Sequence, residues 1–152
     1  MILVSKKRPS VIALLAILTS TFSVNPSASA WSRPSATVSV IGGEGTEEVR
    51  GMTLDRSGNS YLTGYFTGTV DFDPGAGISE LNSNGAEVAY LTKFDESGNF
   101  LWVKIFTGTS DQGIESIALD GDGNILMTGY FYGTADFDPG DQTSNLSSSG
   151  SA

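Results

Sequence analysis

Short runs of aliphatic and aromatic residues, bounded by glycine, proline, asparagine or aspartate, occupy most of the chain. Runs of this length and composition are typical of β-strands. They predict strands at Thr37–Ile41, Val49–Leu54, Ser60–Phe66, Val88–Phe94, Phe100–Phe106, Ile114–Leu119 and Ile125–Phe131. No amphipathic helical stretch follows Ala30, so the chain after this residue is predicted to be all-β.

The chain contains an internal duplication with a constant offset of 65 residues, and positions that far apart are called equivalent below. A register held this long without a gap indicates duplication rather than chance. The matching segments are Leu54–Asn59 with Leu119–Asn124, Thr63–Thr69 with Thr128–Thr134, and Asp71–Gly75 with Asp136–Gly140. The duplication predicts a first β-repeat at 49–113 and a partial second one at 114–152, after an N-terminal segment at 31–48 with one stray strand. The low-complexity stretch Ser147–Ser149 is expected to be disordered or linker-like.

A five-residue turn motif, Asp-x-Ser/Asp-Gly-Asn, occurs three times between predicted strands. The aspartate side chain can accept hydrogen bonds from the amides just ahead of it, and the glycine is expected at positive φ. The asparagine tolerates left-handed values. The structural turn residues are therefore Asp55, Gly58 and Asn59, Asp95, Gly98 and Asn99, and Asp120, Gly123 and Asn124.

A second turn motif is Asp-Pro-Gly, formed by Asp73, Pro74 and Gly75 and by the equivalent Asp138, Pro139 and Gly140. Proline fixes φ at the second position of such a turn, and glycine is expected to supply a positive φ at the third.

These motifs resemble the bacterial β-propeller repeat family called SBBP. The residues concerned are Asp55–Asn59, Tyr61–Phe66, Asp71–Gly75 and Tyr90–Trp102, and the resemblance extends over about Thr37 to Ala152. It implies antiparallel four-stranded propeller-like blades in secreted or cell-surface proteins, with no shared catalytic residues. Thr37 stands where the motif and Trp102 have tryptophan.

The chain carries fewer than two complete copies of this repeat, because the second period stops before its third strand. Repeat units bury their apolar faces on neighbours. We therefore expect self-association through unpaired strand edges, or a chain that belongs to a longer parent protein.

The first thirty residues have the three parts of a secretory signal peptide. Lys6, Lys7 and Arg8 precede the apolar run Val11–Leu18, and Ala28-Ser29-Ala30 offers small residues for cleavage after Ala30. A transmembrane anchor is the alternative, but it needs about 20 apolar residues. The leader predicts a secreted, extracellular or cell-surface protein without a membrane span after cleavage.

Composition excludes several chemistries. The sequence has no cysteine and no histidine, so disulfides, thiol nucleophiles and imidazole bases are absent. The formal net charge is −9, and the part after Ala30 retains all 17 acidic residues but loses three of the eight basic ones. Such a surface repels polyphosphate, which argues against nucleic acid as a partner.

Two acidic motifs could serve chemistry instead of structure. Asp120–Asn124 alternates oxygen ligands like a calcium loop, but Ile125 replaces the required glycine and Phe131 the bidentate glutamate. The pairs Asp71/Asp73 and Asp136/Asp138 could share a cation or act as the acid and base of a glycosidase. The structural alternative is that the first aspartate solvates an exposed face and the second opens the Asp-Pro-Gly turn.

Aromatic residues on the predicted strands could line a sugar-binding surface or pack between sheets. They are Tyr65, Phe66, Trp102, Tyr130, Phe131 and Tyr132. The sequence predicts no catalytic residue, cofactor or metal site. Its leading functional expectation is a non-enzymatic interaction or scaffold module with an unknown protein or glycan partner. The alternatives are an extracellular glycan-acting enzyme using Asp or Glu, and a truncated fragment without activity of its own.

Overall fold

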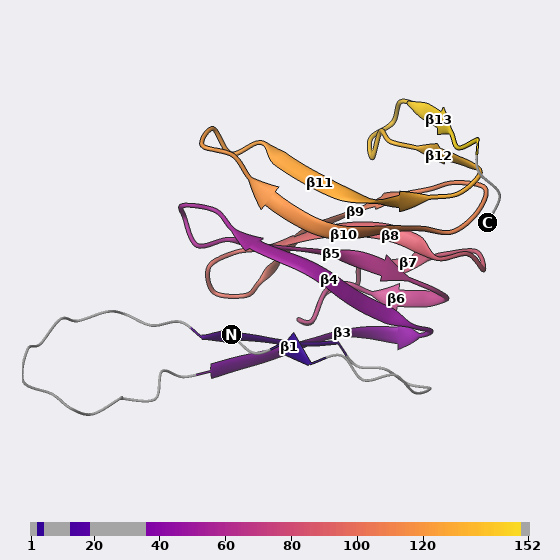
Figure 1. Ribbon diagram of the computed structural model, residues 1–152. Helices are drawn as coiled ribbons and strands as arrows, with labels where there is room; N and C mark the ends of the chain where they lie inside the picture. Colours follow the sequence, from indigo (N-terminus) through magenta and orange to yellow (C-terminus); the bar gives the residue numbers. More distant parts are fainter. Residues whose placement is uncertain (1–2, 5–12, 19–35, 150–152) are drawn as a thin grey trace, which may run out of the picture.

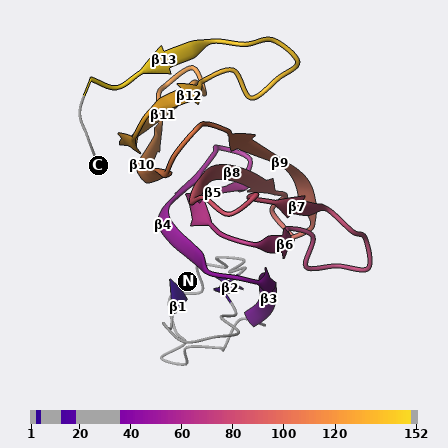
Figure 2. The ribbon, with the colours of Figure 1, turned by 90° about the vertical axis from the view of Figure 1, so that its right-hand side faces the viewer.

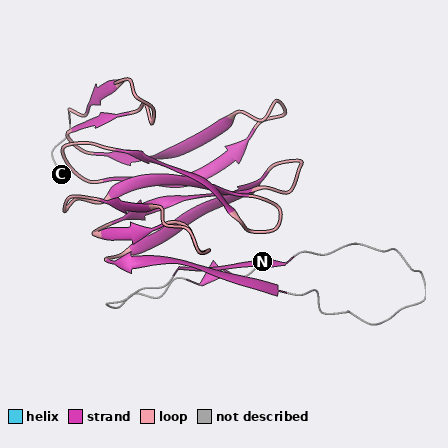
Figure 3. Cartoon of the chain, turned by 180° about the vertical axis from the view of Figure 1, so that it is seen from behind, coloured by secondary structure: helices cyan, strands magenta, loops and turns pink. Residues whose placement is uncertain are grey.

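The structure, a computed structural model, describes residues 3–4, 13–18 and 36–149 (Figure 1). Within these residues the secondary structure consists of strands without a helix, so the all-β prediction is confirmed (Figure 3). Across the same part of the chain, no helix has the length and apolar character needed to cross a membrane.

The strands predicted from the sequence all form, and three of them extend beyond the predicted ends. The strands are β1 Leu3–Val4, β2 Ala13–Leu18, β3 Ala36–Glu44, β4 Glu47–Leu54, β5 Ser60–Phe66, β6 Thr69–Asp71, β7 Glu80–Asn82, β8 Val88–Phe94, β9 Phe100–Phe106, β10 Gln112–Leu119, β11 Ile125–Phe131, β12 Thr134–Asp136 and β13 Asn145–Ser147. The extended strands are β3, β4 and β10. The residues added at the end of β3 and at the starts of β4 and β10 pair with β6, β5 and β11, respectively.

The central sheet is an antiparallel meander in the order β4-β5-β8-β9. The β10–β11 hairpin forms a separate two-stranded sheet, which pairs like β4–β5 and is called the second meander below. Both hairpins have a register shift at the same place, between Val49 and Gly51 in β4 and between Ile114 and Ser116 in β10. Within the described part of the chain, the second edge of β11 has no strand paired to it.

Two short ribbons, β6–β7 and β12–β13, were not predicted because three-residue strands are too short for alternation to be recognised. The end of β3 pairs with β6, through Gly42 opposite Asp71. The equivalent contact is a single bridge between Gly108 and Ala135. Each ribbon is therefore paired to the chain that precedes a hairpin: β6 to the end of β3, and β12 to the segment just after β9.

The predicted disorder of Ser147–Ser149 is wrong for its first two residues. Ser147 ends β13, and the amide of Ser148 donates a hydrogen bond of 2.8 Å to the carbonyl of Gly133. The backbone of Asn145 to Ser147 pairs with β12, which outweighs the tendency of serine-rich chain to remain unstructured.

Part of the predicted leader lies in the described residues. Its apolar run contributes β2, whose backbone pairs with β3 from Ala13 opposite Ile41 to Leu18 opposite Ala36. The basic residues Lys6 to Arg8 and the cleavage site at Ala30 lie outside the described residues.

The central sheet is covered on both faces, and the layers are stacked as Figure 2 shows. One apolar cluster lies between this sheet and β3, β6 and β7; its buried members are Ile41, Leu62, Phe66, Val70, Phe72, Val88, Tyr90 and Phe94. The other lies against β10 and contains Tyr61, Ala89, Leu91, Phe106, Ile114 and Ile117. Alternation along β5 and β8 sends even-numbered residues to the first cluster and odd-numbered residues to the second.

Candidate functional site

The turn at Asp55 is closed by its own carboxylate. Oδ1 accepts hydrogen bonds from the amides of Ser57 and Asn59, each at 2.9 Å, and Oδ2 accepts one from Asn59 Nδ2 at 2.7 Å. Gly58 has a φ of 84°, in the left-handed region that glycine favours. The sequence interpretation missed the role of the asparagine, which closes the turn through its side chain rather than through a left-handed backbone.

The turns at Asp95 and Asp120 repeat this geometry. Their Oδ1 atoms lie 2.8–2.9 Å from two amide nitrogens and their Oδ2 atoms 2.7–2.8 Å from an asparagine Nδ2. Gly98 and Gly123 each have a φ of 87°. The asparagine hydrogen bond is the main reason why the pKa of each of the three aspartates lies below its ordinary value.

The Asp-Pro-Gly prediction needs correction. Neither Gly75 nor Gly140 has a φ in the positive range, because the turn is built on the aspartate side chain instead. Asp73 Oδ1 accepts from the amide of Gly75 at 2.7 Å, and Asp138 Oδ1 accepts from Gly140 at 2.8 Å. This side-chain bond replaces the backbone bond of a type II turn.

The first aspartate of each pair also has a different role from the predicted one. Asp71 was expected to solvate an exposed face, but its Oδ1 accepts hydrogen bonds from the amides of Asp73 at 3.0 Å and Ser79 at 2.8 Å. Asp136 accepts the same two bonds from its equivalent partners. These carboxylates hold the loop between the two strands of each ribbon. In the described ranges, no group of three or more acidic side chains is placed to hold a metal ion.

A buried carboxylate, Glu47, lies at the start of β4. It is 3% exposed, and neither carboxylate oxygen makes a hydrogen bond. Loss of hydration by burial raises its pKa to about 7, although the nearby amides of Glu47 and Gly43 lower it in part. The equivalent residue is Gln112, also 3% exposed, whose Nε2 donates to the carbonyl of Phe106 at 2.7 Å. The sequence shows glutamate and glutamine at equivalent positions, but it does not show that both side chains are buried.

A charged cluster joins β4 to β5 and β10. Tyr65 donates its hydroxyl hydrogen to Glu48, and Arg50 pairs with Glu48 at 3.2 Å and with Glu115 at 3.6 Å. The Arg50 guanidinium also lies 5.5 Å from the centre of the Tyr65 ring. At the neighbouring Gly51, a Cβ would lie 3.2 Å from the Ile117 backbone, so glycine permits close approach of β4 to β10. These contacts join the two meanders.

The predicted aromatic residues do not share one exposed face. Phe66 is fully buried in the first cluster, and Tyr65 is 8% exposed. Trp102 packs edge to face on Tyr61 with ring centres 6.1 Å apart. Tyr132 remains 37% exposed. The structure therefore supports packing for those on β5 and β9, whereas two of those on β11 line the groove described next.

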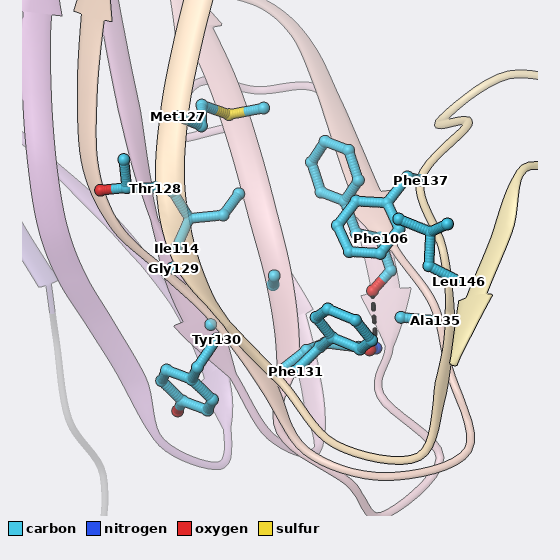
Figure 4. A pocket seen from close by; sticks show the side chains of 13 residues that line it. Phe106, Ile114, Met127, Thr128, Gly129, Tyr130, Phe131, Ala135, Phe137 and Leu146 are labelled. Carbon is cyan, nitrogen blue, oxygen red and sulfur yellow. Dashed lines mark hydrogen bonds between the residues drawn. The ribbon is translucent and has the colours of Figure 1, made fainter. Parts of the chain in front are cut away.

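An apolar groove lies along β11 and faces the β12–β13 ribbon, where the incomplete second repeat was expected to expose an apolar face (Figure 4). It encloses about 360 Å³. Aromatic and aliphatic side chains dominate its wall; the β11 groove is lined by Ala89, Phe106, Gln112, Gly113, Ile114, Met127, Thr128, Gly129, Tyr130, Phe131, Ala135, Phe137 and Leu146. Phe137 and Leu146 on its outer side are 41% and 55% exposed.

Comparison of the chain with protein-family models, curated proteins and solved structures finds no match.

Proposed function

We propose that the chain is a secreted or cell-surface, non-enzymatic interaction or scaffold module built from β-propeller-like repeats. The observation that carries this proposal is the use of the recurring aspartates. At equivalent positions Asp55 and Asp120, and Asp71 and Asp136, each carboxylate is occupied by amides of its own loop. Repeated acidic residues that close loops serve the scaffold, whereas an acid–base pair needs carboxylates free to exchange protons.

The packing of the two meanders supports the propeller-like arrangement. Blades in a propeller stack face to face around a common axis, with their first strands as neighbours. Here the first strands, β4 and β10, approach closely where Gly51 meets Ile117, and Arg50 on β4 pairs with Glu115 on β10. A similar face-to-face contact between further units would extend the array.

Binding in such a module takes place on loops, strand edges and apolar faces rather than at a reactive centre. The β11 groove offers an apolar face next to a strand edge that no described strand pairs with, and both are features of protein interaction sites.

The experiment that tests the proposal has two parts. The full chain with a C-terminal tag is expressed in a bacterium with a general secretion pathway, and the exported protein is sequenced from its N-terminus, which should be Trp31. A matched Ala30→Tyr variant should accumulate as uncleaved precursor, because signal peptidase needs a small residue there. Exported protein is then incubated with a panel of glycans, and release of reducing ends would overturn the non-enzymatic assignment. Recovery of the chain only inside the cell would overturn its export.

A further inference from the structure

Equivalent strands β5 and β11 differ sharply in burial although their sequences are alike. Every residue of β5 is buried, whereas β11 is mostly exposed and keeps only part of its side chains covered. Both faces of β5 are covered by neighbouring elements, and β8 pairs with its second edge along its whole length. No described strand occupies that edge of β11. The molecule thus contains two copies of the same surface. The copy at β5, which β8 covers, is called the filled form, and the copy at β11, which no described strand covers, is called the open form.

The filled form shows which side chain covers the apolar floor. Tyr90 of β8 lies opposite Gly64, and its ring centre is 5.0 Å from Phe72 and 6.4 Å from Phe66. A Cβ at Gly64 would collide with the backbone carbonyl of Glu48, and the Tyr90 hydroxyl donates to that same carbonyl at 3.4 Å.

In the open form, the equivalent aromatic pair is Phe131 and Phe137, with ring centres 5.1 Å apart. Gly129 is the equivalent of Gly64, and Gly113 is the equivalent of the residue that receives the tyrosine hydroxyl. All four residues line the β11 groove (Figure 4). The groove therefore has the floor and the hydroxyl acceptor of the filled form, without its tyrosine.

Two residues that make polar contacts with β8 in the filled form also have equivalents at the β11 groove or in the turn before β11. Thr63 donates its hydroxyl hydrogen to the carbonyl of Tyr90 at 2.6 Å. Its equivalent, Thr128, is exposed and lines the groove. Lys93 of β8 lies 3.5 Å from Asp55, whose equivalent is Asp120 in the turn that precedes β11. A basic residue on an incoming strand would find the same negative charge there.

We propose that the β11 groove binds an extended strand of another polypeptide, antiparallel to β11, that carries the side-chain pattern of β8. Its central aromatic residue covers Phe131 and Phe137, the carbonyl of that residue accepts from Thr128, and a basic residue three positions later approaches Asp120. The proposal rests on the proposed function as an interaction module.

A strand fits this place better than a small apolar ligand. The edge of β11 that no described strand occupies carries backbone N–H and C=O groups, and strand addition satisfies them in the way that β8 satisfies β5. An apolar molecule in the 360 Å³ groove would leave these groups without partners. The acidic chain, with a net charge of −9, also favours a strand that includes lysine or arginine.

A synthetic peptide with the sequence of residues 87–94 is the probe. It is labelled with fluorescein through a soluble spacer and titrated into the purified full chain, in whichever N-terminal form the expressing host yields. Fluorescence anisotropy should show saturable binding. A matched peptide with Tyr90→Ser should bind at least about tenfold more weakly, because the groove loses its aromatic contact.

Protein variants locate the peptide on the molecule. Phe137→Ser and Leu146→Ser alter exposed positions in the groove and should each weaken binding by about tenfold or more. Ile78→Ser is the matched control, since Ile78 is 83% exposed on the loop between β6 and β7, and its peptide affinity should equal that of the unaltered chain. Thermal melts confirm that the variants are folded, and the peptide variant gives an answer that cannot depend on protein folding.

Equal binding of the two peptides, or undiminished binding by both groove variants, would overturn the proposal. It would also be overturned if light scattering showed a dimer at assay concentrations that is broken by Leu146→Ser and not by the peptide, because a second copy would then fill the groove. These outcomes are independent of export and glycan hydrolysis. A chain that is exported and inactive on glycans but does not bind the peptide retains the proposed function and loses this site.

Discussion

Glu47 and Gln112 occupy equivalent buried positions at the starts of β4 and β10, but only Gln112 has a hydrogen bond to a backbone carbonyl. Gln112 donates from Nε2, a group that an ionised carboxylate lacks. Only the protonated form of Glu47 can donate a hydrogen bond in the same way. Burial raises the pKa of Glu47 to about 7 because the charged form loses its hydration.

The first prediction concerns the pH dependence of stability. Because the folded pKa of about 7 exceeds the ordinary value of 4.5, the folded state binds more protons than the unfolded state between these values. The contribution of Glu47 to the free energy of unfolding therefore falls as pH rises from about 4.5 to about 7 and is constant above. Glu47→Gln should leave stability nearly unchanged at pH 4 and raise it by roughly 2–3 kcal/mol at pH 8. Urea unfolding of both proteins across this range measures the difference.

The converse variant, Gln112→Glu, is the control for this prediction. It places a carboxylate at the equivalent buried position and removes the hydrogen bond to Phe106, so its cost should grow over a similar pH range. A difference between Glu47→Gln and the unaltered chain that stays constant from pH 4 to pH 8 would show that folding does not raise the pKa of Glu47.

The second prediction uses two glycines of one loop. Gly121 and Gly123 both have open space where a Cβ would be placed, but only Gly123 has a positive φ, of 87°. Gly123→Ala should cost about 1–2 kcal/mol because an L-residue is strained in that region. Gly121→Ala should be neutral or stabilise by up to about 1 kcal/mol, since it restricts the unfolded chain. Thermal or urea unfolding compares them, and equal effects of the two substitutions would exclude backbone strain as the cause.

The third prediction concerns calcium at the turn from Asp120 to Asn124. Its carboxylate has the same internal hydrogen bonds as the turn at Asp95, which has serine at the middle position. Addition of calcium or of a chelator should leave the melting temperature unchanged, because the loop is closed by its own amides. Asp122→Ser, which converts this loop to the type at Asp95, should behave identically. A melting temperature that rises with calcium in the unaltered chain alone would identify Asp122 as a ligand.

The sequence predicted the long strands and the Asp-x-x-Gly-Asn turns because each depends on local chemistry. Ser60–Phe66 has a continuous strand composition, and Asp55 with Gly58 carries its turn within five residues. The Asp-Pro-Gly turn was misread because a side-chain bond from Asp73 takes the place of the backbone bond. The role of Asp71 was misread because it depends on the amide of Ser79, eight residues away in the chain. Long-range pairing of this kind has no signature in a short window.

The incomplete second repeat predicted an unpaired strand edge with an exposed apolar face, but the shape of the groove and the burial of Glu47 depend on tertiary packing. Phe66 and Phe131 lie in nearly identical local sequences, yet Phe66 is fully buried and Phe131 only partly, because burial depends on whether a third strand pairs alongside. For Glu47, the sequence offered the comparison with Gln112, but burial of both side chains is set by the packing of the sheets. Residues at equivalent positions in the sequence therefore differ in burial because their tertiary contacts differ.

The last prediction turns this difference into a measurement on Phe72 and Phe137, which are equivalent in sequence and differ in exposure, 1% against 41%. Phe72 packs on Phe66 and Tyr90, so Phe72→Ala removes a buried ring and leaves a cavity, at a cost of about 3–5 kcal/mol. Phe137 contacts Phe131 but has no covering tyrosine, so Phe137→Ala should cost only about 1 kcal/mol. Urea unfolding of the two variants measures both costs under one condition. Similar costs would mean that the aromatic floor of the β11 groove is covered in solution, since an open floor cannot contribute the stability of a closed one.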